Sequence, residues 1–403
     1  MPIYLLKGPI DMQVMTDKIH DWGRGIPEVT DAWLVLQTLP GMTPERLHRI
    51  IEIFQDPVEA LRAPDEELAR LAGKKALEYL KRESPSDQAR KLRSQAQKDE
   101  VSIFCRNDVE YPDSLQNIYA PPGALFVKGR IEPRDTLAVA IVGMRTPSPY
   151  GKRMARELSG ALAERGITVV SGLARGIDKE AHEAALEVGG RTIAILGCGL
   201  NINYPAGHTD LRRDIAKSGA VITELTRDAA PRPENFPRRN RLISGLSLAT
   251  VVVEAAQRSG ALLTARLAME QGRELMAVPG PVDSGRSSGC HRILKEGAHL
   301  VETADDIINA LPAYVFESLD SPPVREISEK SIKDSEVRPS AADTTNLSAE
   351  ETIIFEQLEN APNTTEGLTK STKLRPEAVS NILLNLELQG LLRQTKGGLY
   401  ERS

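Results

Sequence analysis

The densest group of chemically active side chains lies in residues 231–241, which we expect to form a loop and where four arginines flank one aromatic ring. Guanidinium groups bind phosphates through paired N–H donors, and aromatic rings stack on nucleobases, so this combination is typical of single-strand recognition. The residues expected to contact DNA here are Phe236, Arg238, Arg239, Asn240 and Arg241. The alternative for Arg239 and Arg241 is an internal ion pair. Glu224 and Glu254 are the candidate carboxylates.

Two other glycine-containing turns each place an arginine close to the start of an expected helix. They span residues 143–151 and 171–178, and a third turn, residues 254–264, offers Ser259 and Gly260 before a helix. A helix start offers free backbone N–H groups and a positive dipole end, which suit a phosphate. The anion contacts expected at these turns are Gly143, Arg145, Ser171, Gly172, Arg175, Gly176, Ser259 and Gly260.

Catalysis is the alternative use of the same turns. A nucleotide N-glycosidase or phosphohydrolase would use Glu254 or Asp178 as its acid and base. The competing interpretation makes Asp178 a helix cap and His182 a packing residue, and no partner in the sequence supports a triad. We expect a protein that is not an enzyme.

No cofactor or metal site is expected. The first turn does not fit GxGxxG, because Arg145 and Pro147 stand where a dinucleotide fold needs glycine, which disfavours NAD and FAD. The three cysteines lie far apart and form no CxxC pair, so neither a zinc ribbon nor a disulfide framework is supported.

The turns must be positioned by a parallel sheet, because buried apolar runs alternate with helical stretches from Thr136 onward. The expected strands are residues 137–142, 167–170, 192–196, 220–223, 249–253 and 275–278. The expected crossover helices are residues 150–165, 179–188, 209–218 and 263–271. The pattern predicts an α/β fold with an extended Rossmann-like, doubly wound, mostly parallel sheet, whose ligands bind where carboxyl ends of strands meet.

Smaller units flank this sheet. We expect a helical domain over residues 26–95, the Rossmann-like domain over 100–312, a flexible linker over 313–346 and a winged helix over 347–403. In the first unit, Leu39 to Thr43 is either a phosphate-binding helix-hairpin-helix turn or a plain helix connection. In the last, the third helix carries Arg375 but also Glu377 and Glu387, so it suits either duplex DNA or protein docking.

Composition fits a protein that remains in the cytoplasm. The 403 residues carry 27% charged side chains and a net charge of -5, so any DNA site must be local rather than spread over the surface. The first residues contain no uninterrupted apolar stretch of the kind that directs export or spans a membrane.

These motifs, in this order, resemble the bacterial DNA-processing protein A family (DprA, also called Smf). The similar segments are residues 108–112, 120–129, 141–145, 171–178, 236–246, 259–260 and 278–280. The small N-terminal domain then looks like the family's SAM or helix-hairpin-helix-like module. Met144 departs from the serine usual in the family, and Arg175 stands where lysine is frequent, which keeps the charge.

The resemblance implies a homodimer that binds single-stranded DNA, protects incoming strands and loads the RecA recombinase in natural transformation. The family's dimer contact would include His291, Leu294 and Leu300. A third hypothesis is a pure scaffold that binds RecA through its terminal domains. We expect instead that residues 101–311 alone still bind DNA.

Overall fold

The computed structural model describes residues 28–312 and, nearer the C-terminus, residues 349–358, 363–372, 379, 382, 383, 386, 392–395 and 399–402. The chain forms two compact units, Met1–Pro323 and Val324–Ser403. The expected linker over residues 313–346 lies outside the described residues, as do residues 1–25. Among the helices that are described, none is long and apolar enough to cross a membrane.

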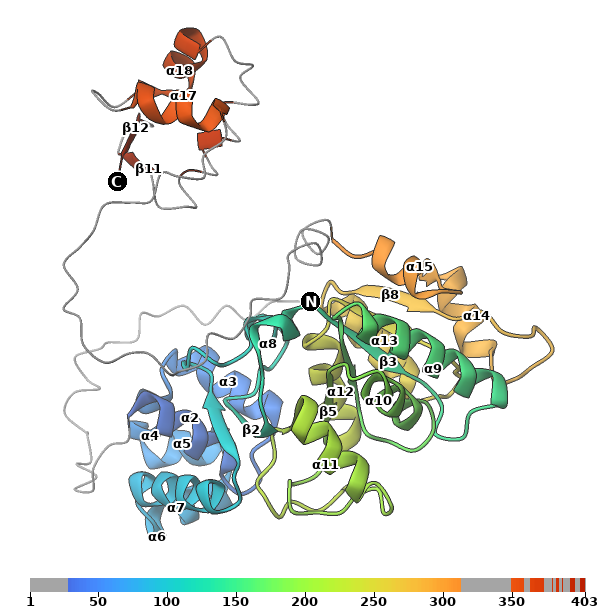
Figure 1. Ribbon diagram of the computed structural model, residues 1–403. Helices are drawn as coiled ribbons and strands as arrows, with labels where there is room; N and C mark the ends of the chain where they lie inside the picture. Colours follow the sequence, from blue (N-terminus) through green and yellow to red (C-terminus); the bar gives the residue numbers. More distant parts are fainter. Residues whose placement is uncertain are drawn as a thin grey trace, which may run out of the picture. The chain divides into compact units, whose positions relative to one another are not determined.

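A nine-stranded sheet forms the centre of the first unit (Figure 1). Its strands are β1 Ser102–Cys105, β2 Ala124–Gly129, β3 Ala138–Val142, β4 Thr168–Ser171, β5 Thr192–Ile195, β6 Ala220–Thr223, β7 Ala249–Val252, β8 Glu274–Ala277 and β9 His299–Leu300. The order is β1-β2-β6-β5-β4-β3-β7-β8-β9, and all pairs from β6 to β9 are parallel. The predicted doubly wound, mostly parallel sheet is confirmed. The chain adds β4, β5 and β6 on one side of β3 and then β7, β8 and β9 on the other, so the direction of winding reverses between β3 and β7.

Helices cover both faces of the sheet and bury its apolar side chains. One face carries α9 Pro149–Glu164, α10 Ile177–Glu187, α11 Thr209–Ser218 and α15 Ala304–Asn309. The other carries α8 Asp113–Gln116, α12 Asn235–Gly245, α13 Ala261–Glu270 and α14 Ser288–Lys295. Alternate residues of β3 enter opposite clusters, Val139 on the first face and Ala140 on the second, as the period of two requires.

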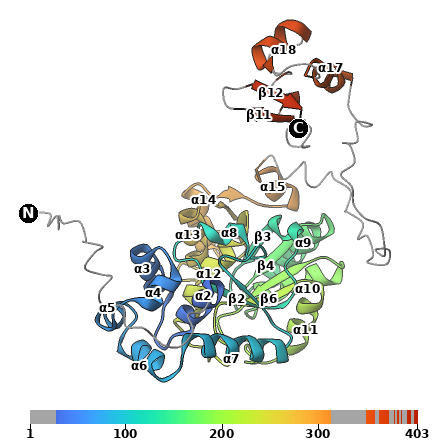
Figure 2. The same ribbon diagram turned by 90° about the vertical axis from the view of Figure 1, so that its left-hand side faces the viewer.

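Six N-terminal helices pack at the β1–β2 end of the sheet (Figure 2). They are α2 Val29–Thr38, α3 Pro44–Phe54, α4 Pro57–Arg62, α5 Asp65–Leu71, α6 Lys74–Arg82 and α7 Pro85–Lys98. Gly73 separates α5 from α6, because its φ of +101° lies outside the helical range. The helices share a hydrophobic cluster with Cys105, Phe126 and Val221 of the sheet.

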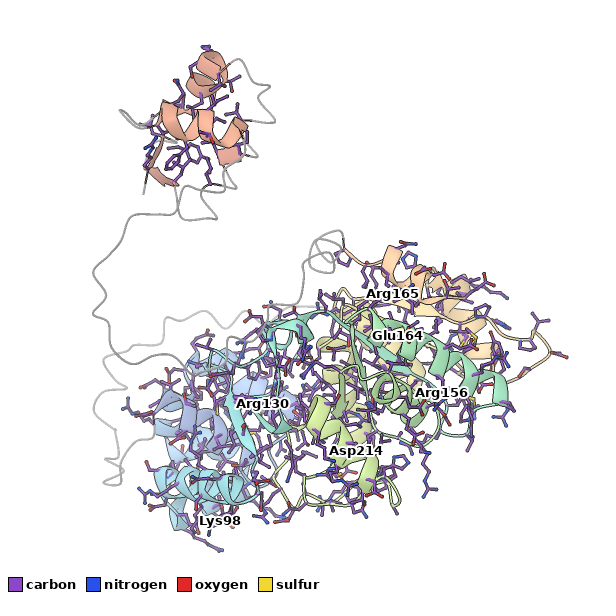
Figure 3. All side chains as sticks on the ribbon, viewed as in Figure 1. Lys98, Arg130, Arg156, Glu164, Arg165 and Asp214 are labelled. Atoms are coloured by element: carbon purple, nitrogen blue, oxygen red, sulfur yellow. The ribbon has the colours of Figure 1, made fainter. Side chains whose placement is uncertain are left out.

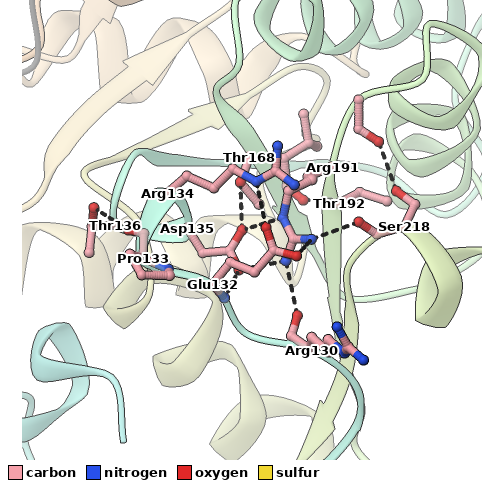
Figure 4. A network of polar contacts seen from close by, with 12 residues as sticks. Arg130, Glu132, Pro133, Arg134, Asp135, Thr136, Thr168, Arg191, Thr192 and Ser218 are labelled. Carbon is pink, nitrogen blue, oxygen red and sulfur yellow. Dashed lines mark hydrogen bonds and ion pairs between the residues drawn. The ribbon is translucent and has the colours of Figure 1, made fainter. Parts of the chain in front are cut away.

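A buried ion network ties the segment before β3 to the start of β5 (Figure 4). Both ends of the Arg191 guanidinium bind Asp135, at 2.9 Å from Nε to Oδ1 and 2.7 Å from Nη2 to Oδ2. The same guanidinium donates to Glu132 Oε1 and to the carbonyl oxygens of Arg130 and Ser218. Five hydrogen bonds thus hold together the segment before β3, Arg191 before β5 and the end of α11.

The second unit has the winged-helix fold. Its elements are α17 Ala349–Gln357, β10 Asn363–Thr364, α18 Thr365–Thr372, β11 Leu392–Thr395 and β12 Leu399–Arg402. Four buried helical residues, Val379, Ile382, Leu383 and Leu386, fall in the expected third helix. The strands order as β10-β12-β11. Arg375, Glu377 and Glu387 of the expected third helix lie outside the described residues.

Candidate nucleic-acid interface

A hollow of about 740 Å³ opens where the strand order reverses, at the carboxyl ends of β3 and β7. We call it the crevice. Its walls come from the turns after β3 and β7, from α12, and from the loop between β5 and α11. The lining side chains able to contact a nucleotide include Arg145, Tyr204, Phe236, Asn240, Arg258 and Ser259. Ligands of open α/β sheets bind at this kind of position.

An aromatic and cationic stack forms one side of the crevice. The Arg145 guanidinium carbon lies 5.5 Å from the centre of the Phe236 ring, and the Tyr204 ring centre lies 5.3 Å from it on a tilted plane. The ring of Phe236 also packs closely on Gly197 just after β5, where an added Cβ would stand 2.8 Å from a ring carbon. Backbone and neighbours therefore hold the ring in place beside an exposed guanidinium.

Residues 231–241 do not form the continuous loop that we inferred, because α12 begins at Asn235. Helical spacing separates their side chains. Phe236, Arg239 and Asn240, at i, i+3 and i+4, line the crevice. Arg238 and Arg241 lie on another side of α12, so four arginines do not converge on one ligand.

The structure corrects the roles of Arg241 and Arg238. Arg241 forms an ion pair with Glu224, and the two side chains are only 8% and 10% exposed, so the internal alternative holds for this residue. Arg238 lies 4.0 Å from Glu45 of α3 and lines a separate small hollow against the N-terminal helices. Glu254, the other candidate carboxylate, instead accepts the backbone N–H of Ser148 at 2.7 Å.

Arg239 lies at the floor of the crevice, and the prediction of a direct phosphate contact is corrected here too. Its side chain is buried and donates to the carbonyl oxygens of Gly172 (2.6 Å) and Ile195. Burial lowers the pKa of Arg239 to about 10, although the negative charge of Asp178 acts to raise it. The guanidinium thus joins α12 to the ends of β4 and β5.

The turn after β4 is mostly structural. Ser171 is fully buried and donates to the carbonyl oxygen of Ile141, which corrects its expected anion contact. Gly172 leaves space for the Arg239 guanidinium, and Gly176, with φ of +81°, lies against the backbone of Met144 and Arg145. Arg175 is exposed but is not among the residues that line the crevice.

The crevice brings together Gly143, Arg145, Phe236, Asn240, Ser259 and Gly260 from the predicted set. Sequence reasoning missed Tyr204 and Arg258. Each had a signal, since Tyr204 is the aromatic residue of the turn after β5, and Arg258 lies in the turn after β7 beside the Ser259–Gly260 pair. Both turns leave carboxyl ends of parallel strands, where side chains converge.

Asp178 and His182 both have structural roles, but Asp178 is not the helix cap that the sequence favoured, because it lies within α10 and the N-cap is Gly176. The Asp178 carboxylate accepts the backbone N–H groups of Gly172 and Ala174, at 3.1 and 3.2 Å. The His182 ring is fully buried, with Nδ1 2.6 Å from the hydroxyl of Thr192. Because that hydroxyl donates to the Val169 carbonyl oxygen, Nδ1 is assigned as the protonated nitrogen.

Burial of His182 predicts acid sensitivity. Burial, with smaller contributions from His208 and Arg239, lowers the pKa of His182 to about 3. The unfolded chain takes up this proton near pH 6.5, so stability falls as the pH drops from about 6.5 towards 3, by at most about 1.4 kcal/mol per pH unit. We expect urea unfolding, measured as a function of pH, to show that His182→Asn loses less stability between pH 6.5 and 3 than the unaltered protein. Parallel curves for the two proteins would contradict the assignment.

Comparisons with known proteins identify matching families for both units. The family model described as DNA recombination-mediator protein A matches residues 102–312, and the model described as DprA winged helix domain matches residues 338–398. An X-ray structure of DNA processing protein A from Streptococcus pneumoniae aligns with a TM-score of 0.60 and 31% identity, covering 71% of this chain and 99% of that one.

Two curated relatives are both named Protein Smf. The one from Escherichia coli K12 is 48% identical over 202 residues, which are 50% of this chain and 54% of the relative. The match therefore spans about half the length of that protein. The one from Synechocystis is 31% identical over 396 residues, which cover 92% of this chain and 98% of the relative.

Proposed function

The chain belongs to the DNA recombination-mediator protein A family, and from this membership we propose that it binds single-stranded DNA in the crevice at the β3–β7 reversal. The observation that carries the proposal is the Arg145–Phe236–Tyr204 stack. A base can stack on an aromatic ring while a neighbouring guanidinium binds its phosphate. Arg258 supplies a second cation across the crevice.

A binding role rather than a catalytic one is part of this proposal. The two carboxylates considered for acid–base chemistry, Asp178 and Glu254, already accept backbone N–H groups. Both side chains are buried, and Glu254 is only 3% exposed. Their geometry supports the turns around the crevice, which accounts for both residues without a reaction.

The wider role proposed is that of a cytoplasmic homodimer that protects incoming single strands and loads RecA in natural transformation. Family membership supports it. For the dimer contact, β9 is an edge strand whose Leu300 is 52% exposed, and an unpaired edge invites a second chain. Leu294 is partly buried nearby, whereas His291 lies within hydrogen-bond distance of the Gly280 carbonyl oxygen. We retain the division into domains at 26–95, 100–312, 313–346 and 347–403 within this proposal.

The test measures the binding of dT oligomers and of duplex DNA of equal length at several salt concentrations. We expect tighter binding of the single strand, with a log–log salt slope that falls by about 0.7 for each phosphate contact removed. Equal affinity for both forms would contradict the proposal. Incubation with nucleoside monophosphates provides the control for enzyme activity, because release of free base would favour the N-glycosidase instead.

A further inference from the structure

A second hollow, of about 510 Å³, shares the β5–α11 loop with the crevice. We call it the α11 groove. Six of its lining side chains carry a positive charge or an amide group: Lys128, Asn201, Asn203, Arg212, Arg213 and Lys217. Asn203 lines the groove and the next residue, Tyr204, lines the crevice, so a single peptide step of about 3.8 Å separates residues of the two hollows.

Two of the cations in the groove are held by carbonyl oxygens. The Arg212 guanidinium donates to the carbonyl oxygens of Leu200 and Ile202, and Lys128 Nζ donates to that of Asp99 at 3.1 Å. Carbonyl oxygens orient these groups but do not cancel their charge. Burial lowers the pKa of Arg212, which is the effect expected for a guanidinium partly withdrawn from water.

The other two cations can exchange their carboxylate partners for a phosphate. Arg213 and Lys217 are 59% and 67% exposed and pair with Asp210 and Asp214 of their own helix. Asp214 lies on α11 in the first unit (Figure 3). Exposed pairs of this kind contribute little, about 0 to 1 kcal/mol, so a phosphate can replace the carboxylate at small cost. Glu100 also lines the groove, which keeps the site only mildly cationic.

We propose that the α11 groove binds the phosphate backbone of the strand segment that leaves the crevice past Tyr204. This inference rests on the proposed single-strand binding and assigns the strand a path. Phosphates contact Arg213 and Lys217. Asn203 accepts the Thr209 hydroxyl through Oδ1 and can donate through Nδ2 to a sugar or phosphate oxygen, whereas Asn201 Nδ2 donates to Asp228. Such contacts do not distinguish bases, so the groove adds affinity without sequence preference.

The test uses the full chain carrying Arg213→Gln and Lys217→Gln, with dT oligomers of about 4 and about 16 nucleotides, the span of known single-strand site sizes. The short oligomer fills the crevice alone. We expect its binding to stay unchanged, while the salt slope for the long oligomer falls by about 1.4, or 0.7 for each contact. An unchanged slope for the long oligomer would overturn the groove assignment.

Two further variants make the outcome specific. Arg70→Gln with Arg90→Gln removes the same charge from exposed residues on α5 and α7, each paired within its own helix, and should leave both slopes unchanged. Asp210→Asn with Asp214→Asn releases the groove cations and should tighten binding of the long oligomer alone. If the unaltered protein bound neither oligomer, the proposed function of the crevice itself would be refuted.

Discussion

Replacing Arg145 by alanine is expected to weaken binding of a dT oligomer by about 10- to 150-fold. A hydrogen bond to a charged group contributes about 1.5 to 3 kcal/mol, and this guanidinium is exposed beside the Phe236 ring with no carboxylate partner among the described residues. Because a phosphate contact is also lost, the salt slope should fall by about 0.7. Fluorescence anisotropy over a salt series measures both quantities.

Two companion variants separate charge from stacking. Phe236→Ala should cost about 1 to 3 kcal/mol, the contribution of one stacked base, and leave the salt slope unchanged. Arg175→Ala is the matched control, since that arginine is exposed but does not line the crevice. If Arg175→Ala weakened binding as much as Arg145→Ala, the strand would not lie where we place it.

Replacing Arg191 by methionine is expected to lower the free energy of unfolding by about 3 to 5 kcal/mol. The change leaves Asp135, whose side chain is 4% exposed, without the cation that neutralises it, and an uncompensated buried charge is costly. Glu132 and the carbonyl oxygens of Arg130 and Ser218 lose a donor as well. Urea unfolding should show a lower midpoint with an unchanged slope, because the surface exposed on unfolding stays the same.

The neighbouring arginine provides the control. Arg134 pairs with Glu132 on the surface and is 62% exposed, so Arg134→Met should change stability by less than about 1 kcal/mol. Adding Asp135→Leu to Arg191→Met removes the stranded charge and should recover part of the loss. Equal effects of the Arg134 and Arg191 substitutions would show that the network contributes no more than a surface pair.

The sheet was predictable because its central strands are buried on both faces. Near-continuous apolar runs such as residues 137–142 and 249–253 are typical of strands buried on both faces, and glycine-containing turns mark their ends. The edge strands β1 and β9, and β2 beside β1, were not predicted. β9 has two exposed residues and β1 only one buried residue, so hydrophobicity does not identify them. β2 is more apolar, but it pairs antiparallel with β6, which lies far away in the sequence.

The candidate site was predictable in residue type but not in geometry. The prolines in residues 231–241 favoured a loop, yet Pro237 is the third residue of α12, where a missing N–H breaks no helical bond. Once that segment is helical, its arginines lie on different sides. One then supports the crevice floor, one pairs with Glu224, and one approaches Glu45.

The amino-acid sequence by itself determined the fold class, the edge of the sheet where the candidate residues meet, and the family resemblance, because hydrophobic period and turn chemistry are local properties. Only the tertiary structure decided which cations remain available for DNA. Burial and ion pairing depend on residues distant in sequence, as when Gly172 and Ile195 engage Arg239 while Arg145 stays exposed over Phe236. A guanidinium has the same chemistry at every position, so its role is set by its neighbours.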